Sequence, residues 1–247
     1  MNISKHIDYT LLDSTTTQRD IIALCEKALE YNYHSVCVSS CYVPLAKEFL
    51  SKSNVKVSTV VGFPFGSSST KVKVYEAKQA IVDGAEEIGM VINLGYLKSK
   101  NYVSILKDIT DVKRIIGKHP LKVIIEISEL NKNEIIKASE ICLDGRADMI
   151  ETSTGFSKSG ATLTAIKIIK KTIKNRAQIK ATGDIFDIET ALKYLEIGTD
   201  RIGAFTAINP VNNARQIRTS KIYRKYLEKG QETPNSELNK TTNKTTL

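Results

Sequence analysis

The sequence predicts an α/β protein folded as a single (β/α)8 TIM barrel. Eight short apolar runs rich in β-branched residues alternate with segments of helical periodicity. Most of these runs are continuously apolar, which is typical of parallel strands covered by helices. The length of 247 residues suits one such barrel. A doubly wound sheet is the alternative, but no G-x-G-x-x-G motif follows the first expected strand.

The expected strands are the apolar runs between turn or helix signals. They are Ile7–Leu12, His34–Ser40, Val55–Phe63, Glu86–Asn93, Leu121–Ser128, Asp148–Thr154, Gln178–Ile185 and Arg201–Thr206. In a barrel of parallel strands, the carboxyl ends of all eight meet at one face, where active sites are built. We therefore expect functional side chains at the ends of these runs.

The expected helices carry apolar residues at a spacing of three and four. They are Thr17–Tyr31, Lys71–Val82, Tyr102–Ile116, Asn131–Leu143, Thr162–Ile173 and Ile188–Leu195. Capping residues mark their beginnings at Ser14–Thr17, Asn131 and Asp187, and glycines mark ends at Gly84, Gly145 and Gly198.

One barrel domain is expected over residues 1–230. Residues 231–247 are rich in Thr, Asn, Ser and Lys and contain almost no apolar residues. Such a segment cannot bury enough surface to order itself, so we expect a disordered polar tail.

Composition narrows the class of protein. The longest apolar stretches are too short for a transmembrane helix, and the first residues lack a secretory signal, so we expect a cytoplasmic protein without a membrane partner. The four cysteines and three histidines do not form a metal-ligand pattern, and we expect reduced thiols and no metal.

The net charge of +9 would suit a protein that binds nucleic acid. The lysines are dispersed, however, and aromatic residues are only 6% of the chain, so no nucleic-acid partner is expected.

Lys180 is the strongest candidate for a functional residue, because it interrupts an apolar strand. Inside a barrel its amine would be desolvated, which lowers the pKa of an amine and makes it more nucleophilic. The pattern alone leaves open whether this lysine is functional or belongs to a structural ion pair.

The chain resembles the deoxyribose-phosphate aldolase family from Ile7 to about Ala207. The motifs that carry the resemblance are Ile7–Leu12, Val36–Val38, Val60–Pro64, Asp83–Ile88, Met90–Asn93, Lys122–Glu126, Thr152–Phe156, Gly160–Thr162, Ile179–Ala181 and Arg201–Gly203. The resemblance implies a class I aldolase barrel that cleaves 2-deoxyribose 5-phosphate through a lysine Schiff base, without a metal or an organic cofactor. It also implies a homodimer or a larger assembly.

The expected site follows from the resemblance. It places Lys180 and Glu151 at the catalytic positions. It places the substrate-binding positions at Asp8, Cys37, Asn93, Thr152, Thr182, Gly183, Asp184, Gly203 and Ala204.

Four positions depart from the family pattern. Glu151 stands where the family has its Schiff-base lysine, and Gly89 stands where it has a proton-relaying aspartate. Asp184 replaces the second glycine of the phosphate-binding pair, and Phe205 replaces a small hydroxyl residue. A carboxylate cannot form an imine, and an aspartate repels phosphate. We therefore expect inefficient cleavage of deoxyribose 5-phosphate.

Glu151 beside Lys180 should favour the ammonium form of the lysine. Three functions remain open. The first is a diverged aldolase-like enzyme acting on a small carbonyl or sugar-like substrate, with Glu151 and Lys180 as an acid/base and electrostatic pair. The second is an inactive homologue used as a binding or regulatory module. The third is residual aldolase (lyase) activity with Lys180 as the Schiff-base lysine.

Overall fold

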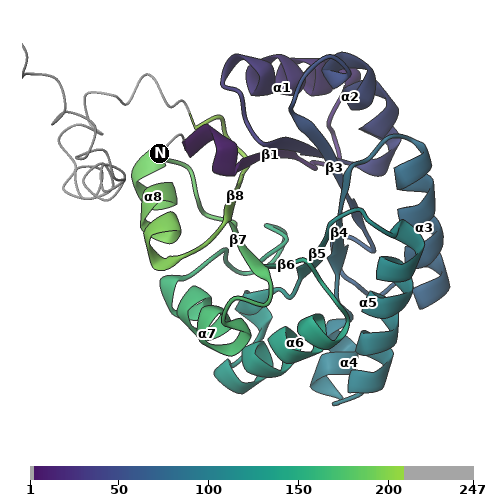
Figure 1. Cartoon of the computed structure of the whole chain (residues 1–247), viewed down its shortest axis with the longest axis vertical. Coiled ribbons are helices and arrows are strands. Elements are labelled where there is room, and N and C mark those ends of the chain that lie inside the picture. The colour runs from purple at the N-terminus through teal and green to yellow at the C-terminus, as the bar shows by residue number, and fades with distance from the viewer. Residues whose placement is uncertain (1–2, 209–247) are drawn as a thin grey trace, which may run out of the picture.

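A computed structural model describes residues 3–208 and shows a closed parallel barrel (Figure 1). Its strands follow one another around the barrel in chain order, and β8 closes it by pairing with β1. The strands are β1 (Ile7–Leu11), β2 (Ser35–Val38), β3 (Lys56–Val61), β4 (Glu87–Val91), β5 (Leu121–Ile124), β6 (Met149–Glu151), β7 (Gln178–Thr182) and β8 (Arg201–Ala204). The predicted fold class is confirmed, and each predicted strand is present in a shorter form.

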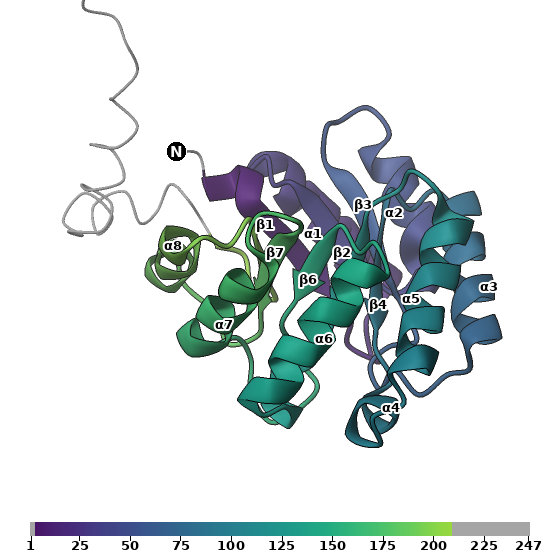
Figure 2. The same ribbon diagram turned by 60° about the horizontal axis from the view of Figure 1, so that its bottom comes forward.

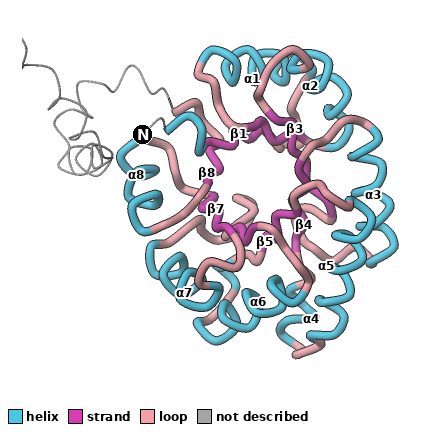
Figure 3. Tube along the Cα trace, in the orientation of Figure 1, coloured by secondary structure: helices cyan, strands magenta, loops and turns pink. Residues whose placement is uncertain are grey.

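Helices surround the strands on all sides, as the tube view shows (Figure 3). They are α1 (Gln18–Glu30), α2 (Val43–Leu50), α3 (Thr70–Val82), α4 (Leu94–Lys98), α5 (Tyr102–Ile116), α6 (Lys132–Asp144), α7 (Leu163–Ile173) and α8 (Ile188–Ile197). Turned on its side, the molecule shows α6 and α7 lying outside β6 and β7 (Figure 2).

The helix caps predicted from the sequence are present. Thr17 and Asn131 form capping boxes at the starts of α1 and α6, and Asp187 accepts the backbone N–H of Thr190 at the start of α8. Gly198 ends α8 in the left-handed conformation at φ 101°, which glycine adopts without a Cβ clash.

Two helices and three 3-10 turns were not predicted. α2 and α4 are short, at 8 and 5 residues, so neither shows a full apolar periodicity. The 3-10 turns are η1 (Ile3–His6), η2 (Ser40–Tyr42) and η3 (Ile127–Glu129). η3 occupies the end of the run expected as one long strand from Leu121, because Glu126 turns the chain at φ 54°.

Two layers of side chains fill the molecule. Side chains that point outward from the strands, such as Ile150, Ala181 and Ile202, join the large apolar core beneath the helices. Those that point into the barrel include charged residues at its amino-terminal and central levels. Alternation along a strand therefore decides which residues can form a site.

Within the described part of the chain, no helix is long and apolar enough to cross a membrane. All four cysteines are free thiols, and three of them are buried. The expected tail at residues 231–247 and the domain boundary at residue 230 lie outside the described residues, so both remain predictions.

Candidate functional site

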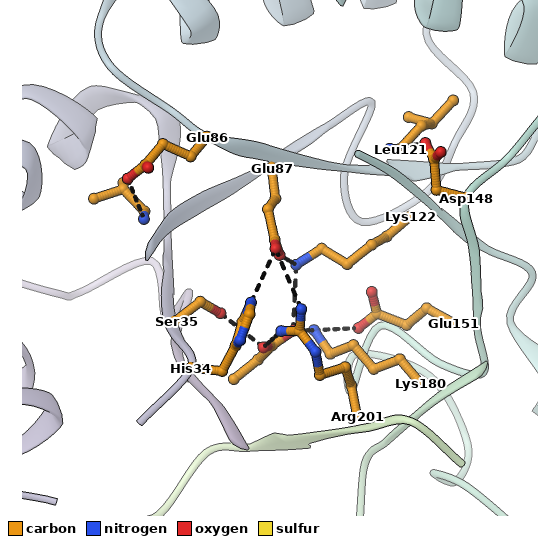
Figure 4. A network of polar contacts seen from close by, with 12 residues as sticks. His34, Ser35, Glu86, Glu87, Leu121, Lys122, Asp148, Glu151, Lys180 and Arg201 are labelled. Atoms are coloured by element: carbon orange, nitrogen blue, oxygen red, sulfur yellow. Dashed lines mark hydrogen bonds and ion pairs between the residues drawn. The ribbon is translucent and has the colours of Figure 1, made fainter. Parts of the chain in front are cut away.

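Glu151 and Lys180 meet inside the barrel, as predicted. They lie opposite each other on β6 and β7, and both side chains point inward (Figure 4). Lys180 Nζ lies 3.0 Å from Glu151 Oε1, and the two side chains are 2% and 6% exposed. Thr182, two residues further along β7, donates its hydroxyl to the same Glu151 oxygen at 2.8 Å. The pair is therefore a buried, hydrogen-bonded ion pair.

Asp8 on β1 is the centre of a larger network. Its Oδ2 lies 3.1 Å from Lys180 Nζ and 3.2 Å from Lys122 Nζ. Its Oδ1 accepts hydrogen bonds from Arg201 at 2.8 Å and from the Ser35 hydroxyl at 2.7 Å. Asp8 is fully buried, so these partners take the place of water around its charge.

Glu87 on β4 completes the network at the amino-terminal side of the barrel. It accepts hydrogen bonds from Lys122 at 2.9 Å and from Arg201 at 3.4 Å, and it contacts His34 Nε2 at 3.1 Å. The network thus joins three cations, Lys122, Lys180 and Arg201, to three carboxylates, Asp8, Glu87 and Glu151. Its formal charge is balanced before His34 is considered.

The network fixes the protonation of its members. Burial alone would lower the pKa of Lys180, but the Glu151 and Asp8 carboxylates outweigh it, so the pKa of Lys180 is raised. Burial alone would raise the pKa of Asp8, but Lys122, Lys180 and Arg201 hold it well below its ordinary value of 3.8. Lys180 is therefore an ammonium at neutral pH, which is the state expected from the sequence.

The opposite wall of the barrel mouth is apolar. Its members come from β1 to β5 and the turns that follow them: Leu12, Cys37, Val60, Val91 and Ile124, with Phe63 packed against them. Gly89 lies in this wall, where an added Cβ would meet Val60 Cγ1 at 3.3 Å and Ile124 Cδ1 at 3.8 Å. Aliphatic side chains therefore border the position at which the resemblance places an aspartate.

A cavity of about 300 Å³ opens at the carboxyl ends of the strands, lined by the loops after β1, β6, β7 and β8. Asp184 lines it and accepts the backbone N–H of Gly160 at 2.6 Å. The ring of Phe205 lies over Gly155, where an added Cβ would be 2.6 Å from Cζ. A carboxylate and an aromatic ring thus occupy the region where the resemblance implies a phosphate subsite.

The other predicted binding residues divide into two groups. Gly183 lines the mouth cavity and packs against Gly160, whereas Gly203 lies inside the barrel beside Thr182 and Lys180. Three residues are engaged elsewhere. The Asn93 side chain caps α4 by accepting the Tyr96 N–H, Thr152 bonds the backbone of Thr182, and Ala204 packs in the outer core.

Asp8, His34 and Glu87 are close enough to share a metal ion, since one ligand atom from each lies within 4.8 Å of the others. Lys122 and Arg201 already contact both carboxylates. A divalent cation would add two charges to a network that is balanced without it, so this cluster is a poor metal site.

Sequence reasoning did not assign roles to Lys122, Glu87 and Arg201, although all three stood in motifs that carried the resemblance. The signal was present for Lys122, which interrupts an apolar strand just as Lys180 does. Glu87 and Arg201 are the first residues of their strands. A charged residue at that position is common and does not indicate a site.

Comparison with known proteins agrees with this fold. The family model of DeoC/LacD family aldolases matches residues 3–192. The deoxyribose-phosphate aldolase of Finegoldia magna is 48% identical over 211 residues, covering 85% of this chain and 99% of the relative. That of Mycoplasma capricolum is 43% identical over 203 residues, covering 82% and 91%. The solved structure of QR15, an aldolase, superposes with a TM-score of 0.83 at 38% identity, covering 88% of this chain and 99% of that one. A tetrameric deoxyribose phosphate aldolase from Aeropyrum pernix shares the fold at 23% identity, with a TM-score of 0.80, covering 87% and 92%. The chain belongs to the DeoC/LacD aldolase family.

Proposed function

We propose that this chain is a diverged deoxyribose-phosphate aldolase that acts on a small, unphosphorylated carbonyl or sugar-like compound without forming an imine. The single observation that carries the proposal is that one of the two carboxylate oxygens of Glu151 is unpaired. Its Oε1 is held by Lys180 and Thr182, while its Oε2 accepts no hydrogen bond from the described residues. One carboxylate oxygen of this buried side chain is therefore unpaired inside the barrel, where we propose that it acts as a base.

The chemistry is a retro-aldol cleavage or an enolisation. Glu151 Oε2 would accept the proton from the hydroxyl group β to a carbonyl or from the carbon α to it. The Lys180 ammonium would stabilise the negative charge that develops on the carbonyl oxygen as the enolate forms. Glu151 would then return the proton to the enolate carbon, so that no atom is gained or lost by the protein.

Two features near the carboxyl ends of the strands support this class of substrate. The Ser153 hydroxyl, two residues beyond Glu151, is buried and has no partner among the described residues, so it would gain from a hydrogen bond to a substrate that enters beside Glu151. Asp184 and Phe205 favour a substrate without phosphate, because one is anionic and the other fills space.

The test is solvent deuterium exchange, followed by NMR, on acetaldehyde, free deoxyribose and glyceraldehyde. We expect exchange at the carbon α to the carbonyl in the wild type and its loss in Glu151→Gln. The matched control is Glu87→Gln, which removes the same charge from the same network at the amino-terminal side. Equal loss in both variants, or no exchange in the wild type, would contradict the proposed role of Glu151.

A second candidate is favoured by the inward position of Lys180, namely residual aldolase activity through a Lys180 imine. Borohydride trapping with acetaldehyde, read by intact mass, tests it directly. An adduct on Lys180 would show that the ion pair opens during catalysis. A folded protein that shows neither exchange nor an adduct would instead be a binding or regulatory module.

A further inference from the structure

A second cavity lies at the amino-terminal end of the barrel, away from the mouth. It has a volume of about 920 Å³ and is lined by loops that precede β5, β6, β7 and β8. Those loops join α5, α6, α7 and α8 to the strands that follow them. Its volume is within the range of small-molecule sites, roughly 300–1,000 Å³.

The lining of this cavity is basic. Four cationic residues contribute to it: Arg146, Lys170, Lys174 and Arg176. Lys170 already has a structural role, because its Nζ donates to Ile197 O at 3.1 Å at the carboxyl end of α8. The structure shows no ion pair between the other three cations and any described residue.

The carboxylates of the lining are already engaged. Asp148 Oδ2 pairs with Lys113 at 2.7 Å and accepts the Leu121 N–H at 2.7 Å. Asp200 Oδ2 accepts the Ile179 N–H at 2.8 Å. Asp148 is therefore paired with a cation outside the lining, whereas Asp200 keeps its charge, which leaves the three free cations in excess.

Thr199 gives a second and independent indication of a ligand. It lines the cavity and is 6% exposed, and its hydroxyl is buried without a hydrogen-bond partner. Buried polar groups are nearly always satisfied in native proteins. This hydroxyl lies inside the cavity wall, so we expect a ligand oxygen to supply the missing partner only after a shift of the loop before β8.

We propose that this cavity binds a small metabolite with two or more phosphate groups. Two guanidinium groups match phosphate oxygens in charge and in forked geometry. No aromatic residue lines the cavity, so nothing in it would stack on a nucleobase, and a compact phosphorylated compound fits better than a nucleotide. The site is separate from the mouth and does not depend on the function proposed there.

The test uses the full chain with inorganic pyrophosphate as the probe, titrated by calorimetry at fixed ionic strength. Arg146→Ala with Arg176→Ala should weaken binding about tenfold or more, since each charge-assisted contact typically contributes that much. The matched control is Lys71→Ala with Lys132→Ala, which removes two exposed lysines from outside the cavity. It should leave the dissociation constant within about twofold.

Thr199→Val separates a binding role from a purely structural one. Removing an unsatisfied buried hydroxyl should leave the melting temperature unchanged or higher, while pyrophosphate binding weakens. A higher melting temperature with unchanged binding would overturn the role of Thr199. Two results would overturn the site itself: no pyrophosphate binding by the wild type, whether or not a DNA duplex binds, or equal weakening in the lysine control.

Discussion

Replacing Glu151 by Gln tests whether the interior network depends on charge balance. Glutamine keeps the shape and an acceptor oxygen for Thr182, so the change removes charge and little else. Lys180 would keep Asp8 at 3.1 Å, but Asp8 also serves Lys122 and Arg201. Three buried cations would then face two carboxylates.

Two costs limit the expected loss in the free energy of unfolding. Breaking a buried ion pair by removing one partner costs about 3–5 kcal/mol, and the retained acceptor oxygen places this case near 3. Lys180 could instead lose its proton, which from its ordinary pKa of 10.5 costs about 5 kcal/mol at pH 7. We therefore expect a loss of about 3 kcal/mol, or a melting temperature lower by roughly 6–12 °C.

Thermal and urea unfolding at two pH values checks this result. In the variant, neutralising Lys180 becomes easier as the pH rises, so the difference from wild type should shrink between about pH 7 and pH 9.5. The control is Glu140→Gln, which breaks an exposed pair with Lys137 and should change stability by about 0.5 kcal/mol or less. A Glu151→Gln deficit no larger than that of the control, or one independent of pH, would refute the reasoning.

Four further expectations can be checked separately. The pKa values of Asp8 and Glu87 are held below their ordinary values of 3.8 and 4.5, so stability should fall as the pH drops below about 4.5, measured by urea unfolding. Glu151→Lys alone should destabilise the fold, whereas Glu151→Lys with Gly89→Asp should fold and form a trappable imine with acetaldehyde, read by intact mass. Cleavage of deoxyribose 5-phosphate should be at least about 10³-fold slower than in a family enzyme, and a coupled assay giving about 1 s⁻¹ would contradict this. The chain should be a homodimer by light scattering, and a monomer would overturn that expectation.

The barrel was predictable because strand and helix signals agree along the chain. Continuous apolar runs such as Gln178–Ile185 indicate parallel strands, and the caps at Thr17, Asn131 and Asp187 indicate where helices begin. Strand ends were less predictable, because apolar character continues past the last paired residue. Glu126 shows why, since its backbone turns the chain while the sequence around it still reads as strand.

The Glu151–Lys180 contact was also predictable, because register on adjacent parallel strands determines which side chains meet. The rest of the network was not. Asp8 and Lys122 are separated by 114 residues, and only closure of the barrel brings their strands' inner sides together. Spacing along the sequence carries no signal for such a contact.

The two departures at Glu151 and Gly89 are best understood together. Relative to the family pattern that the sequence resembles, one change places a carboxylate at a lysine position and the other removes a carboxylate from β4. The first change alters the interior charge by −2 and the second by +1, so together they remove one positive charge, and the network observed here is balanced at three cations and three anions. An interior with unequal numbers of buried cations and carboxylates would lower the free energy of unfolding by several kcal/mol. The chain therefore has a balanced interior, and the function proposed above uses the carboxylate that β6 carries, Glu151.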